Sequence, residues 1–369
     1  MTDLATLSET QRQGEATRAA MGLQLRARPL WSGPDRFAPG ITQQFVQPYR
    51  MRGVNSPNQR FENIVHNGTL YAAECPDAMG YVYTSTDLRA WTARVVDGNS
   101  LVMAGTLMAV GSLLVLKTQY SGTYYFRTSV DNGVTWIYQA SVGGTSVLVS
   151  AGGIGYVLNA ASHTDFRTVT PANAAGTVRS FTTARVWRNM LHNGTRWLVL
   201  DDSASAGEWS ANGLNGWTAA AGLPAAVEKL PLGGRIGYAI GGRFVVLSCG
   251  VGKLSSVYSE QGETWHVGAM GEADPRGWSV DVIGSRGTEL NGVLYIPIRV
   301  SDGTRTFSAM LATPDGVRFK WLPPYMEEVI TPPIIGKRAD DTGLLFNAGN
   351  GASNRFESNP DALEVYLAL

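Results

Sequence analysis

The amino-acid sequence predicts an all-β protein: a single seven-bladed β-propeller preceded by an N-terminal helical and irregular extension. A turn-plus-strand unit recurs at intervals of about 37–51 residues, the repeat length of one four-stranded blade. A second type of turn follows several copies of this unit. The composition agrees, because 43 glycines, 10 Trp and 14 Tyr in 369 residues suit many tight turns between short strands.

The recurring unit is a two-residue turn that leads into an apolar, β-branched or aromatic run, as in a β-hairpin. Clear copies lie at 66–71 (HNGTLY), 192–197 (HNGTRW) and 290–295 (LNGVLY), and looser copies at 104–107, 152–156, 241–244 and 342–346. Because a blade cannot bury both of its faces alone, blades must stack until a ring closes. Seven copies predict seven blades; six is the alternative if the last copy shares a blade with an N-terminal strand such as 41–49.

The second motif, which we call the box turn, occurs five times. Its complete copy, Ser-x-Asp-x-Gly-x-Thr-Trp, is formed by Ser129, Asp131, Gly133, Thr135 and Trp136. Partial copies are Ser85, Asp87 and Trp91; Ser210, Asn212 and Trp217; Gly262, Thr264 and Trp265; and Asp315, Gly316 and Trp321. A short Asp or Asn side chain can accept backbone N–H groups in such a turn, and a Trp can fill space between neighbouring sheets. We therefore predict structural roles for all these residues.

The box turns resemble the Asp-box, or bacterial neuraminidase (BNR), repeats of sialidase-like propellers over roughly residues 60–325. The resemblance implies a six- or seven-bladed propeller whose boxes lie on outer hairpins, away from the catalytic face. A sialidase site would also need three arginines, an acid/base carboxylate and a Tyr nucleophile activated by Glu. The family's Phe/Tyr-Arg-Ile-Pro motif is absent from this sequence. The available arginines, none of them in a recognisable context, are Arg127, Arg235, Arg276, Arg299 and Arg305.

Other chemistries have less support in the sequence. No nucleophile elbow, P-loop or metal-ligand spacing occurs, and His66 and His192 occupy equivalent positions beside the repeated turn. We therefore predict no catalytic residue, no metal site and no cofactor. Lys plus Arg equals Asp plus Glu at 30 each, which favours neither nucleic acid nor an anionic membrane as partner. No apolar run is long enough for membrane insertion.

Residues 1–60 differ in texture from residues 61–369, which we assign to the propeller. Residues 3–26 are predicted to form a helix, with Ser8 and Gln11 as a possible capping box, and a Pro- and Gly-containing segment follows it. Two interpretations stay open: the helix lies against the outside of the ring, or residues 1–30 dock on other protein subunits.

Two functions from different classes fit these observations. The sequence favours a non-enzymatic structural or interaction module of a larger assembly, namely a tail or appendage component of a tailed-phage virion involved in attachment or in receptor or glycan binding. Degenerate box turns, loops rich in Gly, Ala, Thr and Ser, and an N-terminus without the pattern of a secretory signal support it, the last indicating synthesis in the cytoplasm and location in the virion. The alternative is a sialidase-like glycoside hydrolase acting on surface glycans.

Overall fold

The computed structural model describes most of the chain between residues 45 and 367. The described ranges are 45–50, 63–74, 80–87, 90–96, 102–144, 146–158, 163–201, 206–220, 236–250, 253–268, 279–283, 287–290, 292–301, 303–304, 306–327, 334–337, 343–347 and 362–367. Within them the chain forms 29 β-strands and no helix. The all-β prediction is therefore confirmed, whereas the helix predicted at 3–26 and the docking segment 1–30 lie outside the described residues.

Six sheets, which we call blades 1 to 6, are each built from consecutive strands that pair in antiparallel fashion. Blade 1 contains β2 (Asn63–His66), β3 (Tyr71–Glu74), β4 (Tyr81–Ser85) and β5 (Thr92–Val95). Blade 2 contains β6 (Val102–Val110), β7 (Leu113–Tyr120), β8 (Thr123–Ser129) and β9 (Ile137–Val142). Blade 3 contains β10 (Val147–Ala151), β11 (Ile154–Leu158), β12 (Asp165–Thr170) and β13 (Asn173–Ser180).

The other three blades of this kind follow in chain order. Blade 4 contains β14 (Trp187–His192), β15 (Trp197–Asp201), β16 (Gly207–Ser210) and β17 (Thr218–Ala219). Blade 5 contains β18 (Ile236–Ile240), β19 (Arg243–Gly250), β20 (Lys253–Ser259) and β21 (His266–Val267). Blade 6 contains β22 (Ser279–Ile283), β24 (Val293–Ser301), β25 (Thr306–Thr313) and β26 (Lys320–Glu327), with β23 (Thr288–Leu290) also paired to β24.

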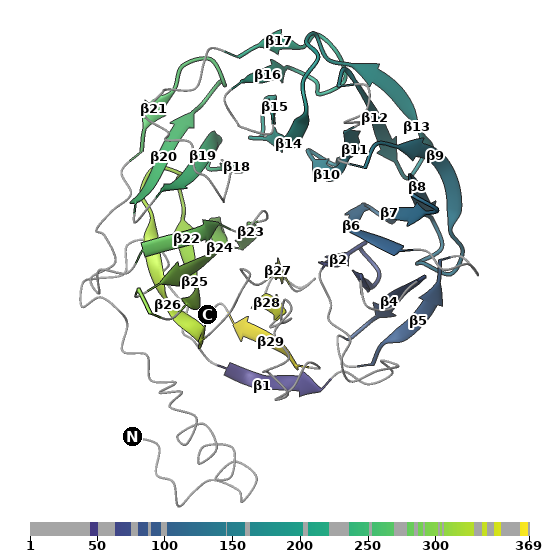
Figure 1. The fold of residues 1–369 in the computed structure, drawn as a ribbon, viewed down its shortest axis with the longest axis horizontal. Coiled ribbons are helices and arrows are strands. Elements are labelled where there is room, and N and C mark those ends of the chain that lie inside the picture. Colours follow the sequence, from purple (N-terminus) through teal and green to yellow (C-terminus); the bar gives the residue numbers. More distant parts are fainter. Residues whose placement is uncertain are drawn as a thin grey trace, which may run out of the picture. The chain divides into compact units, whose positions relative to one another are not determined.

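A seventh sheet, the closing blade, combines both ends of the described chain. Its order is β1 (Phe45–Arg50), β29 (Ala362–Leu367), β28 (Gly343–Asn347) and β27 (Ile334–Lys337). Strand β27 contacts β2 of blade 1 and β23 of blade 6, so the sheets of the described residues form a closed ring (Figure 1). The ring is a β-propeller, and the pairing of β1 with β29 ties the two ends of its chain together.

The closing blade also clarifies the predicted blade count and domain boundary. The last turn copy lies at β28 and does share a sheet with an N-terminal strand, β1, yet the described residues form seven sheets because each copy belongs to a different one. Strand β1 falls inside the range 1–60 that we assigned to the N-terminal segment, and its pairing places these six residues in the propeller. For the rest of that range the division stays a prediction.

The repeated turns join the first and second strands of most blades. Gly68, Gly153, Gly194 and Gly242 have positive φ there, and so does Gly292 between β23 and β24, as a two-residue hairpin turn requires. The copy predicted at 104–107 is an exception, because it lies inside β6, where the register shifts between Met103 and Leu107. The corresponding turn of blade 2 is at 111–112, so the spacing found the blade but not its turn.

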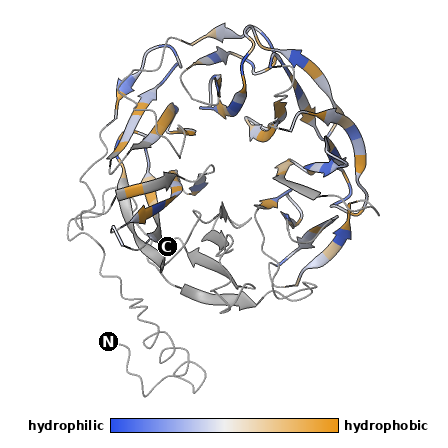
Figure 2. Cartoon of the chain, in the orientation of Figure 1, coloured by the Kyte–Doolittle hydropathy of each residue, from blue (hydrophilic) through white to orange (hydrophobic). Residues whose placement is uncertain are grey.

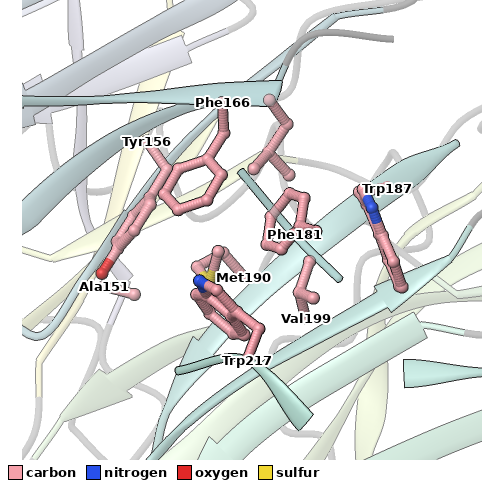
Figure 3. Close-up of a cluster of buried hydrophobic side chains, with 9 residues drawn as sticks. Ala151, Tyr156, Phe166, Phe181, Trp187, Met190, Val199 and Trp217 are labelled. Atoms are coloured by element: carbon pink, nitrogen blue, oxygen red, sulfur yellow. The ribbon is translucent and has the colours of Figure 1, made fainter. Parts of the chain in front are cut away.

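The core lies between neighbouring blades, and hydrophobic segments occur on the coloured strands of blades 1 to 6 (Figure 2). Separate buried clusters join blades 1 and 2, blades 2 and 3, and blades 4 and 5. The cluster between blades 3 and 4 is the most aromatic, and Figure 3 shows its members facing one another. They include Tyr156, Phe166, Phe181, Trp187 and Trp217. Blades 1 to 5 thus bury apolar faces against one another, as the repeat argument required.

Candidate functional site

The complete box turn joins β8 to β9 and is held by its own hydrogen bonds. The Ser129 hydroxyl donates to the Asp131 carboxylate at 2.8 Å, and it accepts the Gly133 N–H at 2.9 Å. The Thr135 N–H and hydroxyl donate to the Asp131 carboxylate at 2.9 and 2.5 Å. The Trp136 indole N–H donates to the Gly133 carbonyl at 3.1 Å. Every polar group of the motif therefore has a partner inside the turn.

Asp131 illustrates why such a turn makes a poor catalytic group. Burial alone would raise the pKa of its carboxyl, but the hydrogen bonds from Thr135 and Ser129 outweigh this effect and hold the pKa below its usual value. Gly133 has φ +81°, and a Cβ there would lie 3.3 Å from Thr84 of blade 1. The turn therefore needs glycine both for its backbone conformation and for its contact with the neighbouring blade.

Each of the four partial copies keeps one of two bonds of the complete copy. One is the bond from a glycine N–H to the first hydroxyl, and the other is a bond from a backbone N–H to the Asp or Asn side chain. The hydroxyls of Ser210, Ser259 and Thr313 accept the N–H groups of Gly213, Gly262 and Gly316 at 3.1, 2.8 and 2.8 Å. Around these bonds, the side chains of Asp87, Asn212 and Asp315 accept further backbone N–H groups. The common element is a hydroxyl at the end of a blade's third strand, and in every copy except that of Ser85 a glycine follows it.

The last copy shows what sequence reasoning missed. Thr313, rather than a serine, begins this turn, and Phe319 is the buried aromatic residue six positions later. The same offset separates Ser85 from Trp91 and Ser259 from Trp265. Trp321, which we had placed in the motif, lies in β26 opposite Leu311. A search for any hydroxyl residue followed by glycine three or four positions later would have found Thr313.

Two asparagines at the repeated turns connect neighbouring blades. The Asn67 amide donates to the Ser112 carbonyl at 3.2 Å and to the Asn132 side chain at 2.8 Å, both in blade 2. The Asn193 amide donates to the carbonyls of Gly242 and Glu260 in blade 5 at 2.9 and 2.8 Å. The first turn of one blade and the box turn of the next blade therefore lie on the same face of the ring, which we call the box face.

The two histidines beside these turns are also part of the scaffold. His66 Nδ1 accepts the Gly68 N–H at 3.1 Å, and its ring lies 4.7 Å from that of Tyr71. The His192 ring lies 3.9 Å from that of Trp197. Burial lowers the pKa of both histidines, which favours neutral rings packed on aromatic neighbours. Their predicted equivalence is therefore visible in the structure.

On the opposite face of the ring, charged side chains bind the segments that connect one blade to the next. Lys117 donates to the carbonyls of Gly144 and Ser146, both at 2.8 Å, in the link from blade 2 to blade 3. Burial and then the charge of Arg188 lower the pKa of Lys117, and the charge of Glu74 opposes this shift. Lys117 therefore stabilises the backbone of this connecting segment through its two hydrogen bonds.

The link from blade 3 to blade 4 is held in a similar way. The buried Glu208 carboxylate accepts the N–H groups of Thr182 and Thr183 at 2.9 and 2.7 Å, and also the Thr183 hydroxyl. Asp201 pairs with Arg185 at 3.4 Å in the same region. Both carboxylates are engaged by the chain itself, an arrangement that organises the backbone rather than a reaction.

Two of the arginines considered for a sialidase site are described by the structure, and they lie in different blades, Arg127 in blade 2 and Arg299 in blade 6. The Arg127 Nε, in β8, donates to the Thr118 hydroxyl of the adjacent strand at 3.4 Å, and Arg299 lies in β24 opposite Ser308. Arg235, Arg276 and Arg305 lie outside the described residues. In the described ranges, no group of three or more His, Cys, Asp or Glu side chains could hold a metal ion. The described residues also include no helix that could cross a membrane.

The surface feature that remains is apolar and belongs to blade 2. Eight large hydrophobic side chains are exposed in the described part of the chain, and four of them lie together along the box turn and start of β9. These four, Val130, Val134, Ile137 and Tyr138, form what we call the blade-2 rim patch. Ile137 and Tyr138 are 56% and 50% exposed, so half or more of each side chain is open to contact.

Comparison with known proteins identifies the architecture. The sequence matches no protein-family profile and no curated protein. The fold is similar to a structure titled "YCF48 bound to D1 peptide", with 10% identity and a TM-score of 0.54 over 91% of this chain and 99% of that one. YCF48 from Cyanidioschyzon merolae gives 9% and 0.52 over 87% and 98%. A GH74 xyloglucanase from Xanthomonas campestris gives 12% and 0.52 over 89% and 56%. At such identities the likeness shows the propeller fold.

Proposed function

We propose that this chain is a protein-interaction module of a larger assembly and that it binds a protein partner through the blade-2 rim patch. The observation that carries the proposal is the gathering of Val130, Val134, Ile137 and Tyr138 on one outer hairpin. Single exposed apolar residues are ordinary on protein surfaces, but four of them within nine residues of one hairpin offer a partner more apolar area than the scattered ones elsewhere in the described chain.

The chemistry of the patch favours protein over nucleic acid. Residues 130–138 contain one acidic side chain, Asp131, and no Lys or Arg. The Asp131 carboxylate accepts hydrogen bonds from Thr135 and Ser129. The hairpin strands contain one cation, Arg127, opposite Tyr138, and its Nε is bound to the Thr118 hydroxyl, so the hairpin lacks the cluster of cations that a phosphate backbone requires. A partner with an apolar, neutral surface would remove the exposed Ile137 and Tyr138 side chains from water, which stabilises the complex.

One structural neighbour adds limited support. Its title says that YCF48 was bound to the D1 peptide, so a propeller of this general fold can take part in peptide binding. Because one fold serves many functions, the likeness contributes nothing about which surface is used. The assignment to a phage tail or appendage, the docking of residues 1–30 on other subunits and the binding of a surface glycan stay finer proposals, supported by the sequence features described above.

The test is site-specific cross-linking in the assembled particle. A photo-reactive amino acid at position 137 or 138 is expected to cross-link to one defined protein, which mass spectrometry would identify. The same amino acid at position 267, in β21 of blade 5, is the matched control, because Val267 is also exposed, at 67%. Labelling of purified virions by an antibody against this chain tests the finer assignment.

Binding of the purified partner then measures the contribution of the patch. Replacing Ile137 by Lys should weaken binding at least about tenfold, or about 1.4 kcal/mol, because the ammonium group would be buried against an apolar surface. The control Val267→Lys should leave the affinity unchanged. Equal cross-linking from positions 137 and 267, or equal affinity of the two variants, would contradict the proposal.

A further inference from the structure

Strand β9 offers a hydrogen-bonding edge as well as apolar side chains. It is the last strand in the order β6-β7-β8-β9, and it pairs with β8 on one side. On the other side, the described residues contain no strand that pairs with it. Such an edge presents a row of backbone N–H and C=O groups and can act as a template for another extended chain.

The outer strands of the other blades are protected against this reaction in ways that β9 is not. Strands β17 and β21 are two residues long, which is too short to pair with a partner strand. The longer ones contain proline or charge: Pro48 in β1, Arg94 in β5, Arg179 in β13, and Pro323 and Pro324 in β26. Proteins use short strands, proline and charge to prevent edge-to-edge pairing.

Strand β9 has none of these features. Its sequence, IYQASV, contains no proline, no glycine and no charged residue over six residues. Its pairing with β8 shifts register between Tyr138 and Ala140, at Gln139, but among the outer strands of the described sheets it is the longest without proline or charge. An edge of this length without proline or charge can pair with an extended segment of a partner.

The side chains of β9 indicate which partner fits. Successive residues of a strand point to opposite faces, so Ile137 and Tyr138 flank the edge on its two faces. The Tyr138 ring lies 5.3 Å from that of Tyr125 in an edge arrangement, which limits its motion. Ala140 and Val142 are packed against the cluster between blades 2 and 3. A strand added here would meet the exposed apolar side chains of Ile137 and Tyr138, against which a charged residue would lose part of its hydration.

We propose that an extended, uncharged segment of the partner protein adds to β9 as a fifth strand of blade 2. The backbone groups of the edge provide the hydrogen bonds, and Ile137 and Tyr138 select alternating apolar or β-branched side chains. This inference rests on the proposed function, because it specifies how the blade-2 rim patch holds its partner.

The test uses the full-length protein and a synthetic probe. The probe is a peptide of alternating Val and Thr with the length of β9, six residues, and with solubilising groups outside this core. Two further peptides carry N-methyl groups on alternate amides, one in each register, and a third replaces Val by Glu. Binding is measured by fluorescence anisotropy, and hydrogen exchange is followed at residues 137–142 and, for comparison, at β13.

We expect the unmodified peptide to bind and to slow exchange at residues 137–142 but not at β13. One N-methylated peptide should bind about tenfold more weakly, because it lacks the amides that face the edge, and so should the Glu peptide. In the protein, Ser141→Lys should have a similar effect, because it charges the exposed edge while keeping the blade-2 rim patch. Val267→Lys should have none.

Three outcomes would overturn the inference. If both N-methylated peptides bind as well as the unmodified one, side chains alone hold the partner, and the proposed function stands without strand addition. Absence of binding or of protection at residues 137–142 has the same meaning, provided that position 137 still cross-links in the particle. Self-association of the chain that protects these amides would assign the edge to a second copy. Loss of the cross-link as well would remove the proposed function.

Discussion

Blades 2 and 4 carry the same kind of box turn but stabilise it differently. In blade 2 the turn is held by its own hydrogen bonds, with Asp131 bound to Thr135 and the Trp136 indole bound to the Gly133 carbonyl. In blade 4 the aromatic residue is buried instead. Trp217 is 6% exposed, and its ring lies 5.0 Å from that of Phe181. Both turns are held by local hydrogen bonds, such as Gly133 N–H to Ser129 and Gly213 N–H to Ser210, and they differ in how deeply the Trp side chain is buried.

The outer surfaces of the two blades differ in the same sense. The outer strand of blade 2, β9, has six residues and exposes Ile137 and Tyr138, whereas β17 of blade 4 has two residues. In blade 4 the Arg196 guanidinium lies 4.2 Å from the Trp209 ring and pairs with Glu263 of blade 5 at 2.8 Å. Blade 4 thus covers its aromatic surface within the ring. The two blades therefore differ in how much apolar surface they leave exposed at the outer edge.

The largest expected effect is the loss of the buried Trp of blade 4. Trp217→Ala should lower the free energy of unfolding by about 3–5 kcal/mol, because it leaves a cavity among aromatic side chains. Trp136→Ala should cost less, about 1–3 kcal/mol, because Trp136 is half-buried. Denaturant unfolding of both variants measures the difference. Equal losses would show that the two boxes depend on the core to the same extent.

The next effect concerns the asparagines that join neighbouring blades. Asn193→Ala should cost about 2–3 kcal/mol, since it leaves the Gly242 and Glu260 carbonyls without their amide donor. Asn67→Ala should cost a similar amount at the contact between blades 1 and 2. Thermal unfolding measures both, and Asn215→Ala at an exposed position is the control. A change within error for Asn193→Ala would contradict its role as a tie between blades.

The box of blade 2 should respond to acid, and the box of blade 4 should not. The folded state holds the pKa of Asp131 below its usual value of 3.8, so its stabilising effect is complete above that pH and is lost as the pH falls through the folded pKa. Asp131→Asn should therefore cost about 1 kcal/mol at neutral pH and progressively less in acid. Asn212 of blade 4 carries no such charge. The test is to measure the free energy of unfolding of both proteins at several pH values between neutral and acid. A cost of Asp131→Asn that does not change with pH would contradict the prediction.

The smallest effect is expected from the ion pairs that cover blades 4 and 5. Arg243 pairs with Glu260 at 3.3 Å, and Glu260 is 67% exposed on its side chain. Arg243→Gln should therefore cost at most about 1 kcal/mol, and added salt should reduce the cost. Stability measured at low and high ionic strength gives the comparison. The Arg243 guanidinium also lies 5.5 Å from the centroid of the Tyr258 ring, and a larger, salt-independent loss would indicate that this contact dominates.

Sequence periodicity located most of the blades because the same local chemistry recurs in each. Positive φ at Gly68, Gly153 and Gly194 is a property of a two-residue turn, and such a turn can be recognised without any knowledge of its surroundings. The exception at 104–107 arose because a glycine inside a strand that shifts register resembles a turn glycine in the sequence. The missed Thr313 and Phe319 show the complementary error, since hydroxyl and aromatic groups were expected to be Ser and Trp.

The blade contacts could not be read in this way. Asn67 and Asn193 were recognised as turn residues, but their amide groups donate to residues of the next blade that lie 45 to 67 positions further along the chain. Nor does the sequence alone show that β1 pairs with β29 to close the ring. Such contacts depend on how the blades stack, which is a property of the assembled ring.

The amino-acid sequence by itself determined the all-β class, the repeating blade and the box turns, because each depends on interactions among residues close together in the chain. Only the tertiary structure decided which apolar residues are covered. Ile137, Tyr138, Phe181 and Trp217 are all large apolar or aromatic residues, yet stacking of blades 3 and 4 buries the last two and leaves the first two on an outer edge. The physical reason is that burial requires a neighbouring surface, and distant parts of the chain supply it.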